Sequence, residues 1–132
     1  MRNIKFRAWD KEGNVMYLPK TIDGHIGEVY DYEGNEWHTL YRDDTDLLIM
    51  QFTELLDKNG KEIYEGDIVS FGKDYFDVDM LGKVYWYDKT AGFFIHRFDA
   101  EGQIEEEVLI SDYDIEIIGN IYENPELLES EK

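Results

Sequence analysis

Short hydrophobic runs alternate with polar turns along most of the chain, and this pattern predicts β-strands joined by hairpins. Asp favours the first position of a type I turn, and Gly favours the position after it because Gly adopts positive φ without strain. The chain repeats the pattern Asp-x-x-Gly at residues 10–13, 31–34, 57–60 and 99–102, with a version one residue longer at 88–92. Such loops predict a series of antiparallel hairpins.

Runs rich in β-branched and aromatic residues flank these turns and predict strands. They span residues 4–9, 15–18, 47–52, 67–71, 83–87, 93–98, 104–110 and 115–118. The run 47–52 also fits the start of a helix, since Asp46 would cap one well. Its Ile, Phe and neighbouring Thr content favours a strand. Residues 83–87 and 93–98 are expected to pair across the loop 88–92.

The end of the chain predicts a short helix. Asn124 suits the N-cap, Pro125 the first helical position and Glu126 the positive end of the helix dipole. The helix is expected to run from residue 125 to about residue 129, with 129–132 as a frayed tail. Residues 21–46 are weakly patterned and form a variable loop region in this interpretation, with a long loop or an irregular hairpin over 21–41.

Length and pattern together predict a mainly β fold. The expected architecture is a single domain over residues 1–132, made of consecutive antiparallel hairpins that form a barrel-like or sandwich-like core, with a short C-terminal helix. The chain contains three Trp, ten Tyr and seven Phe residues. So many aromatic residues argue against disorder, despite the high charge.

Composition narrows the cellular setting and the chemistry. The chain has no cysteine, which excludes disulfides, thiolate metal sites and cysteine nucleophiles. No hydrophobic run approaches the roughly 20 residues that span a bilayer, and residues 1–7 lack the core of a signal peptide. We therefore expect a cytoplasmic protein without a membrane association.

The charge is strongly and unevenly negative. The formal net charge is −18, and residues 98–132 hold 12 acidic residues but only one basic residue, Lys132. This charge disfavours direct nucleic-acid binding, because the chain would repel a phosphate backbone. The concentration of acids is typical of a solvated face, or it marks a surface for a basic partner. The candidate binding residues are Glu105, Glu106, Glu107, Asp112 and Asp114.

Metal and cofactor motifs are missing from the sequence. A calcium loop of the EF-hand type needs a first oxygen ligand five residues before its glycine. The corresponding positions hold Ala8, Val29, Leu55 and Arg97. The histidines His25, His38 and His96 lie far apart, without ligand spacing. We expect no metal and no cofactor.

Catalytic motifs are missing as well. Neither Ser70, Ser111 nor Ser130 lies in a Gly-x-Ser-x-Gly elbow, and phosphate-binding glycine loops are absent. The sequence therefore predicts a protein that is not an enzyme.

Two further side-chain roles are structural. Asp67 follows a Gly turn and is expected to accept backbone N–H groups that lock a loop. Lys5 and Arg7, with Arg2, are expected to form exposed ion pairs worth about 0–1 kcal/mol each.

Three blocks of the chain resemble the YopX family of phage and prophage proteins. They are residues 4–10 (IKFRAWD), residues 51–53 (QFT) running into 57–69 (DKNGKEIYEGDIV), and residues 118–128 (IGNIYENPELL). The resemblance implies a phage or prophage origin in a Gram-positive-type bacterial host and a mainly β fold. It carries no functional residues over, because the family has no assigned activity. Glu54 departs from the pattern, which continues with Gly at this position.

Three functions remain open at this point. The first is an interaction protein whose acidic surface binds a basic host or phage protein. The second is an oligomeric structural protein, since edge strands can pair between chains. The third is a small-ligand or enzyme module with a pocket lined by aromatic residues such as Trp37 or Trp86.

Overall fold

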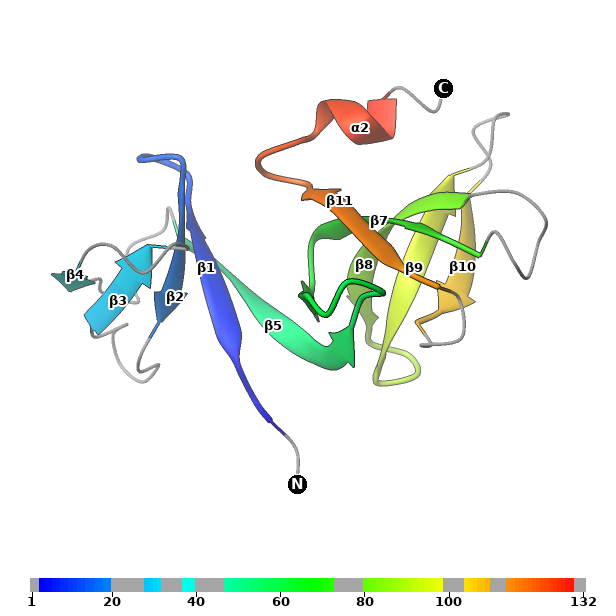
Figure 1. Cartoon of the computed structure of the whole chain (residues 1–132), viewed down its shortest axis with the longest axis horizontal. Coiled ribbons are helices and arrows are strands. Elements are labelled where there is room, and N and C mark those ends of the chain that lie inside the picture. Colours follow the sequence, from blue (N-terminus) through cyan, green and yellow to red (C-terminus); the bar gives the residue numbers. More distant parts are fainter. Residues whose placement is uncertain are drawn as a thin grey trace. The chain divides into compact units, whose positions relative to one another are not determined.

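The chain folds into antiparallel sheets in a computed structural model, which describes residues 3–19, 28–31, 37–39, 47–72, 80–98, 104–109 and 114–129. Eleven strands and one short helix lie within these residues (Figure 1). The chain divides into two compact units, one of residues 3–51 and one of residues 52–132 together with residues 1–2.

The first unit is organised around strand β1 (Phe6–Asp10). It pairs with β2 (Val15–Pro19) across the first Asp-x-x-Gly turn, with Trp9 opposite Met16. On its other side β1 pairs with the start of β5 (Leu47–Leu56). The run 47–52 is therefore a strand, as its composition predicts.

A second hairpin extends this sheet. Strands β3 (Glu28–Asp31) and β4 (Trp37–Thr39) pair with each other, and β3 pairs with β2. They lie inside the region predicted to be a long loop or an irregular hairpin, and the hairpin alternative is the one that forms. The rest of residues 21–46 falls outside the described residues.

The second unit contains a curled, half-barrel sheet with the strand order β10-β9-β8-β7-β11. Its strands are β7 (Asp67–Phe71), β8 (Met80–Tyr87), β9 (Gly92–Phe98), β10 (Ile104–Val108) and β11 (Glu116–Asn120). The end of β5 pairs separately with β6 (Glu62–Tyr64). Helix α2 (Glu126–Glu129) follows β11, close to its predicted position.

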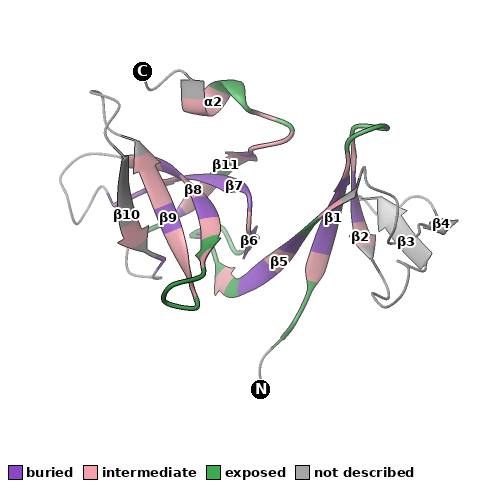
Figure 2. Ribbon diagram, turned by 180° about the vertical axis from the view of Figure 1, so that it is seen from behind, coloured by how far each residue is buried: buried purple, intermediate pink, exposed green. Residues whose placement is uncertain are grey.

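The core of the second unit includes residues from three strands of this sheet, β7, β8 and β9. Its buried members are Ile63, Val69, Phe71, Val84, Ile95, Leu109 and Ile115. Figure 2 shows the buried stretch of β7 and the buried middle of β9. The sheet is tight here, since a Cβ atom on Gly82 would lie 2.6 Å from Ile95 Cγ2 and 2.8 Å from the His96 carbonyl oxygen. Glycine is therefore required for β8 and β9 to approach.

The three predicted turns that lie within the described residues, at 10–13, 57–60 and 88–92, form, but two of them close differently from the Asp-x-x-Gly expectation. Gly60 has the positive φ expected of it, at 84°. In the other two described loops the positive φ falls on Asn14 and Ala91. At the first loop the Asn14 N–H donates to the Asp10 carbonyl, so the turn closes one residue later than the pattern predicts. The turns at 31–34 and 99–102 extend beyond the described residues.

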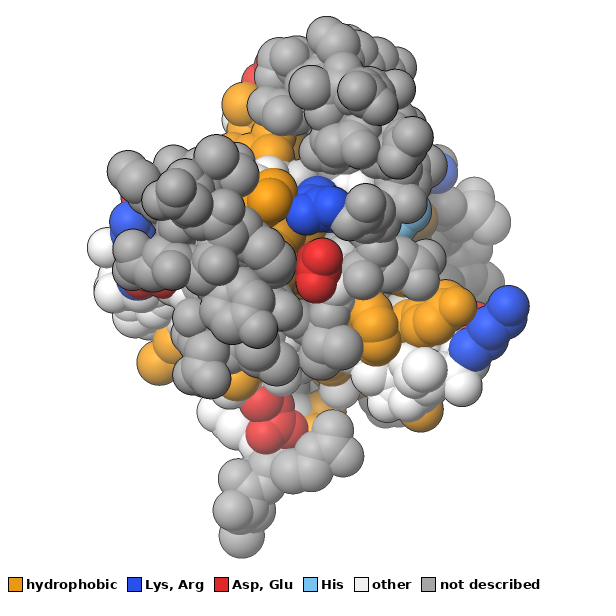
Figure 3. All heavy atoms as spheres, turned by 90° about the vertical axis from the view of Figure 1, so that its right-hand side faces the viewer, with side chains coloured by type: hydrophobic (Ala, Val, Ile, Leu, Met, Phe, Trp, Pro, Cys, Tyr) orange, Lys and Arg blue, Asp and Glu red, His pale blue; other side chains and the backbone are white. Residues whose placement is uncertain are grey.

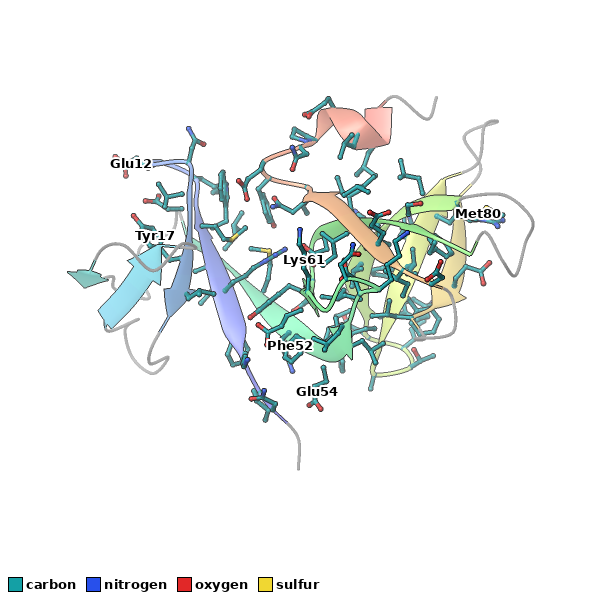
Figure 4. All side chains as sticks on the ribbon, viewed as in Figure 1. Glu12, Tyr17, Phe52, Glu54, Lys61 and Met80 are labelled. Atoms are coloured by element: carbon teal, nitrogen blue, oxygen red, sulfur yellow. The ribbon has the colours of Figure 1, made fainter. Side chains whose placement is uncertain are left out.

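Strand β5 contains a strained position. Its pairing with β6 shifts register between Phe52 and Leu56, and Glu54 between them has a φ of 74°. The Thr53 hydroxyl spans this bulge by donating to the Ile63 carbonyl at 2.8 Å. Glu54 is exposed (Figure 4). The departure of Glu54 from the family pattern therefore coincides with a backbone conformation that favours glycine.

The expectation of an exposed ion pair is wrong for Arg7, which is only 3% exposed. Its neighbours Ala8 and Trp9 are also buried. Consecutive residues of a strand point to opposite faces, so both faces of β1 are covered at this point. The guanidinium of Arg7 is therefore enclosed together with its aliphatic stem. Lys5 is exposed, and Arg2 lies outside the described residues.

The predicted fold class is confirmed: the protein is mainly β, with antiparallel sheets, one of them curled into a half-barrel, and a short C-terminal helix. The extent of one domain over residues 1–132 stays a prediction. Within the described part of the chain, no helix has the length and hydrophobicity needed to cross a membrane.

Candidate functional site

Three of the five candidate acidic residues lie on one strand. Glu105, Glu106 and Glu107 occupy consecutive positions of β10, the outermost strand of the half-barrel sheet (Figure 1). Asp114 is exposed and precedes β11, the strand at the opposite end of the sheet order. Asp112 lies outside the described residues. The fold therefore gathers the three glutamates at one sheet edge, while the five residues as a single surface stay a prediction.

Glu107 has a basic partner within its own sheet. Its carboxylate lies 3.9 Å from the Arg97 guanidinium on β9, and the two side chains are 22% and 12% exposed. The same guanidinium donates to the Met80 sulfur at 3.4 Å, at the start of β8 (Figure 4). Part of the acidic charge of β10 is thus compensated locally. On the face shown in Figure 3, the described side chains include hydrophobic, basic and acidic groups.

The other edge of the sheet is closed by the turn that begins at Asp57. The Lys58 N–H donates to the Ile115 carbonyl at 2.8 Å, just before β11. The Ile117 N–H, within β11, donates to Asp57 Oδ2 at 3.1 Å. An ion pair of 3.2 Å between Lys58 and Glu116 lies beside these bonds, with both side chains about two fifths exposed. Two backbone groups at this edge are therefore already bonded inside the unit.

Asp57 is a structural anion. It is 6% exposed, and its Oδ1 accepts the N–H groups of Asn59 and Lys61 at 2.8 and 2.9 Å. Burial by itself raises the pKa of this carboxyl, but the backbone N–H groups and the charge of Lys61 favour the ionised form. The pKa of Asp57 is consequently below its ordinary value of 3.8. The chemistry of this carboxylate is that of a turn lock rather than of an acid or base catalyst.

Asp67 has the role that its position after a glycine turn predicts. It is 2% exposed and accepts the Tyr64 N–H at 2.8 Å. The adjacent Gly66 donates to the Val84 carbonyl and accepts from the Ile121 N–H, both at 2.8 Å. One tight turn thereby holds the start of β7 against β8 and against the segment that follows β11.

Aromatic residues of β8 and β9 contact one another across the sheet. Trp86 is 42% exposed and packs edge-on against Phe93, with ring centroids 5.0 Å apart. On the other face Tyr85 contacts Phe94 and, at 5.5 Å, His96. These are the cross-strand pairs that stabilise a sheet. The side chain of Trp37, the other aromatic candidate for a ligand pocket, is not described.

In the described part of the chain, no group of three or more His, Asp or Glu side chains could hold a metal ion. His96 is half-buried in β9, while His38 lies in β4 without a described side chain. Ser70 lies in β7. His25, Ser111 and Ser130 are outside the described residues.

Sequence reasoning missed two features of this region. The turn pattern predicts the local bonds of Asp57 but not its bond to Ile117, which is 60 residues away. The pairing of Arg97 with Glu107 was also missed, although a lone arginine before a long acidic stretch was a signal for it. The bond to Ile117 depends on which distant strands become neighbours, and no local pattern encodes that. The pairing of Arg97 with Glu107 depends on the register of the β9–β10 hairpin.

The chain matches the model of a protein family and resembles a solved structure. The model of the family described as YopX protein matches residues 5–129. The crystal structure of protein EF1440 from Enterococcus faecalis resembles the structure with a TM-score of 0.62 and 27% sequence identity, and the match covers 97% of this chain and 99% of that chain. No curated protein matches the chain.

Proposed function

Because the chain belongs to the YopX family, we propose that it is a non-catalytic interaction protein, encoded by a phage or prophage and active in the cytoplasm of a bacterial host. In this proposal its acidic C-terminal region binds a basic host or phage protein. The family membership supports the origin, and the charge of the chain supports the kind of partner.

The observation that carries the proposal is the place of the acidic residues in the sheet. Glu105, Glu106 and Glu107 lie together on the outermost strand, in a stretch of 35 residues whose only basic member is Lys132. A field of one sign attracts a partner of the opposite sign and speeds their association. The same field repels a phosphate backbone, which favours a protein partner over nucleic acid.

The proposal is tested by capture from host lysate on the immobilised protein at low and moderate salt. A variant in which Glu105, Glu106, Glu107, Asp112 and Asp114 become Gln or Asn should lose a partner that wild type retains. The captured protein should be basic. It should dissociate as the salt concentration rises, because interactions between exposed charges are screened over about 10 Å at 0.1 M ionic strength.

A second variant controls for net charge alone. It neutralises the same number of acidic residues outside residues 98–132, at the exposed or half-buried positions Glu12, Glu54, Glu62, Glu65 and Asp88. This variant should keep the partner. If both variants lose it equally, the partner responds to total charge and the assigned surface is wrong. A salt-independent partner that both variants retain would rule out the acidic mode of binding.

A further inference from the structure

The pairing of β10 with β9 fixes which residues of β10 direct their backbone N–H and C=O groups toward the outer edge of the sheet. The Leu109 N–H donates to the Phe93 carbonyl at 3.2 Å, and the register of the two strands is continuous from that point. In an antiparallel pair, alternate residues direct both backbone groups toward the partner strand. Leu109, Glu107 and Glu105 therefore face β9, and the N–H and C=O groups of the other three residues of β10 face away from it: Ile104, Glu106 and Val108.

Among the described strands, β10 pairs on one side only, with β9. The opposite edge differs, since Asp57 and Lys58 already bond to the edge groups around Ile115 and Ile117. An open row of edge groups can bind another strand. The outward N–H and C=O groups of β10 therefore face no other described strand, unlike the groups at the β11 end of the sheet.

The charge of β10 selects what can pair there. If two copies of β10 paired antiparallel through their outward residues, Glu106 of one copy would stand opposite Glu106 of the other, because Glu106 is the middle of the outward set. Like charges directly opposite each other destabilise a strand pair. Acidic edge residues therefore discourage self-association and favour an incoming strand that carries positive charge.

We propose that the β10 edge binds an extended basic segment of its partner, which adds to the half-barrel sheet as a further strand. Main-chain hydrogen bonds from Ile104, Glu106 and Val108 supply the affinity, and lysine or arginine side chains of the segment are selected by the glutamates. This inference rests on the proposed function and adds the mode of recognition and the conformation of the partner.

The test uses the whole protein and three synthetic nine-residue peptides, with binding measured by fluorescence anisotropy at about 50 mM salt. One peptide alternates Lys with Val and favours an extended strand. A second carries the same number of Lys residues among Ala and favours a helix. A third alternates Glu with Val. The first peptide should bind at least tenfold more tightly than the second, and the third should not bind.

Two variants at one position separate the backbone from the charge. Glu106→Pro removes the outward N–H together with the charge, whereas Glu106→Gln removes the same charge and keeps the N–H. Because this N–H lies outside the β9 ladder, proline is compatible with the edge strand. Glu106→Pro should weaken binding of the first peptide about tenfold beyond Glu106→Gln, which corresponds to one lost hydrogen bond of about 1.4 kcal/mol.

Amide hydrogen exchange of the wild-type protein provides a readout that does not depend on the variants. Addition of the first peptide should slow exchange at Glu106 and Val108. Suppose that the two variants bind the first peptide equally, that the strand and helix peptides bind equally, and that exchange is unchanged. The edge is then not used for binding, whereas the proposal of binding by charge still stands. If neither basic peptide binds, and lysate yields no salt-sensitive basic partner, both the recognition mode and the proposed function are overturned.

Discussion

At the scale of single residues, Glu54 is the clearest case of a side chain in an unfavourable place. Its φ of 74° lies in the left-handed region, where a residue with a Cβ atom costs roughly 1–2 kcal/mol. Changing Glu54→Gly should therefore stabilise the protein relative to Glu54→Ala by about 1 kcal/mol. Both variants lose the glutamate side chain, so their difference isolates the backbone strain. Urea unfolding of the two variants measures it, and equal midpoints would contradict the assignment of strain.

A second single residue, Asp57, makes the free energy of unfolding depend on pH. Its folded-state pKa is depressed, so its contribution is present above the ordinary value of 3.8 and is lost as pH falls through the lower folded value. Wild type should be more stable than Asp57→Asn at pH 7, by about 1–3 kcal/mol, because three backbone N–H groups lose an ionised acceptor. The gap should narrow below about pH 4.

Unfolding free energies of both proteins between pH 2.5 and pH 7 provide the measurement for Asp57. Parallel curves for wild type and Asp57→Asn would show that this carboxyl has the same pKa in the folded and unfolded chain. The substitution keeps the size of the side chain, so a change in packing does not account for a pH-dependent difference.

At the scale of elements, the close approach of β8 and β9 depends on Gly82. A methyl group there would meet Ile95 Cγ2 at 2.6 Å and, less avoidably, the His96 backbone carbonyl at 2.8 Å. Gly82→Ala should destabilise the protein by about 1–3 kcal/mol, the usual cost of overpacking. Gly92→Ala is the matched control, since its nearest neighbour would be 3.8 Å away. Thermal unfolding of the two variants should differ clearly, and similar losses would disprove the close contact.

The hairpins could be predicted from sequence because their signals are local. The loop 88–92 and the aromatic runs beside it identify β8 and β9, and Asn124 with Pro125 identifies the start of the last helix. Strands β3 and β4 were harder to recognise because their residues lack clear alternation. The pairings of β1 with β5 and of β7 with β11 join distant segments, so they have no sequence signal.

In the candidate site, too, some features follow from neighbouring residues in the sequence and others from the arrangement of strands. The run of acids at 105–107 is visible in the sequence, and its strand conformation follows from the flanking Ile104 and Val108. That this strand is outermost depends on the order of strands in the sheet, whereas the place of Arg97 beside Glu107 depends on the register of the β9–β10 hairpin. The burial of Arg7 is likewise a result of packing on both faces of β1, which no pattern of charges indicates.

At the scale of the whole molecule, the net charge of −18 opposes compactness. Self-repulsion of this kind is screened by salt, with a Debye length of about 30 Å at 0.01 M and about 10 Å at 0.1 M. The unfolding midpoint in urea should therefore rise as NaCl increases from about 10 mM to about 300 mM. KCl should act equally, because screening does not depend on the identity of the cation. A midpoint that falls with either salt would show that attractive ion pairs outweigh the repulsion.

The position of β11 in the sheet has a consequence for synthesis on the ribosome. Strand β7 is made early in the second unit, yet one of its two neighbours, β11, begins only at Glu116, near the end of the chain. Until that strand emerges, one edge of β7 and the Oδ2 atom of Asp57 lack the native partners that β11 provides. A nascent chain therefore carries an open hydrophobic strand edge through most of the translation of this unit, which is a hazard for aggregation. Its high negative charge keeps neighbouring nascent chains apart during that interval.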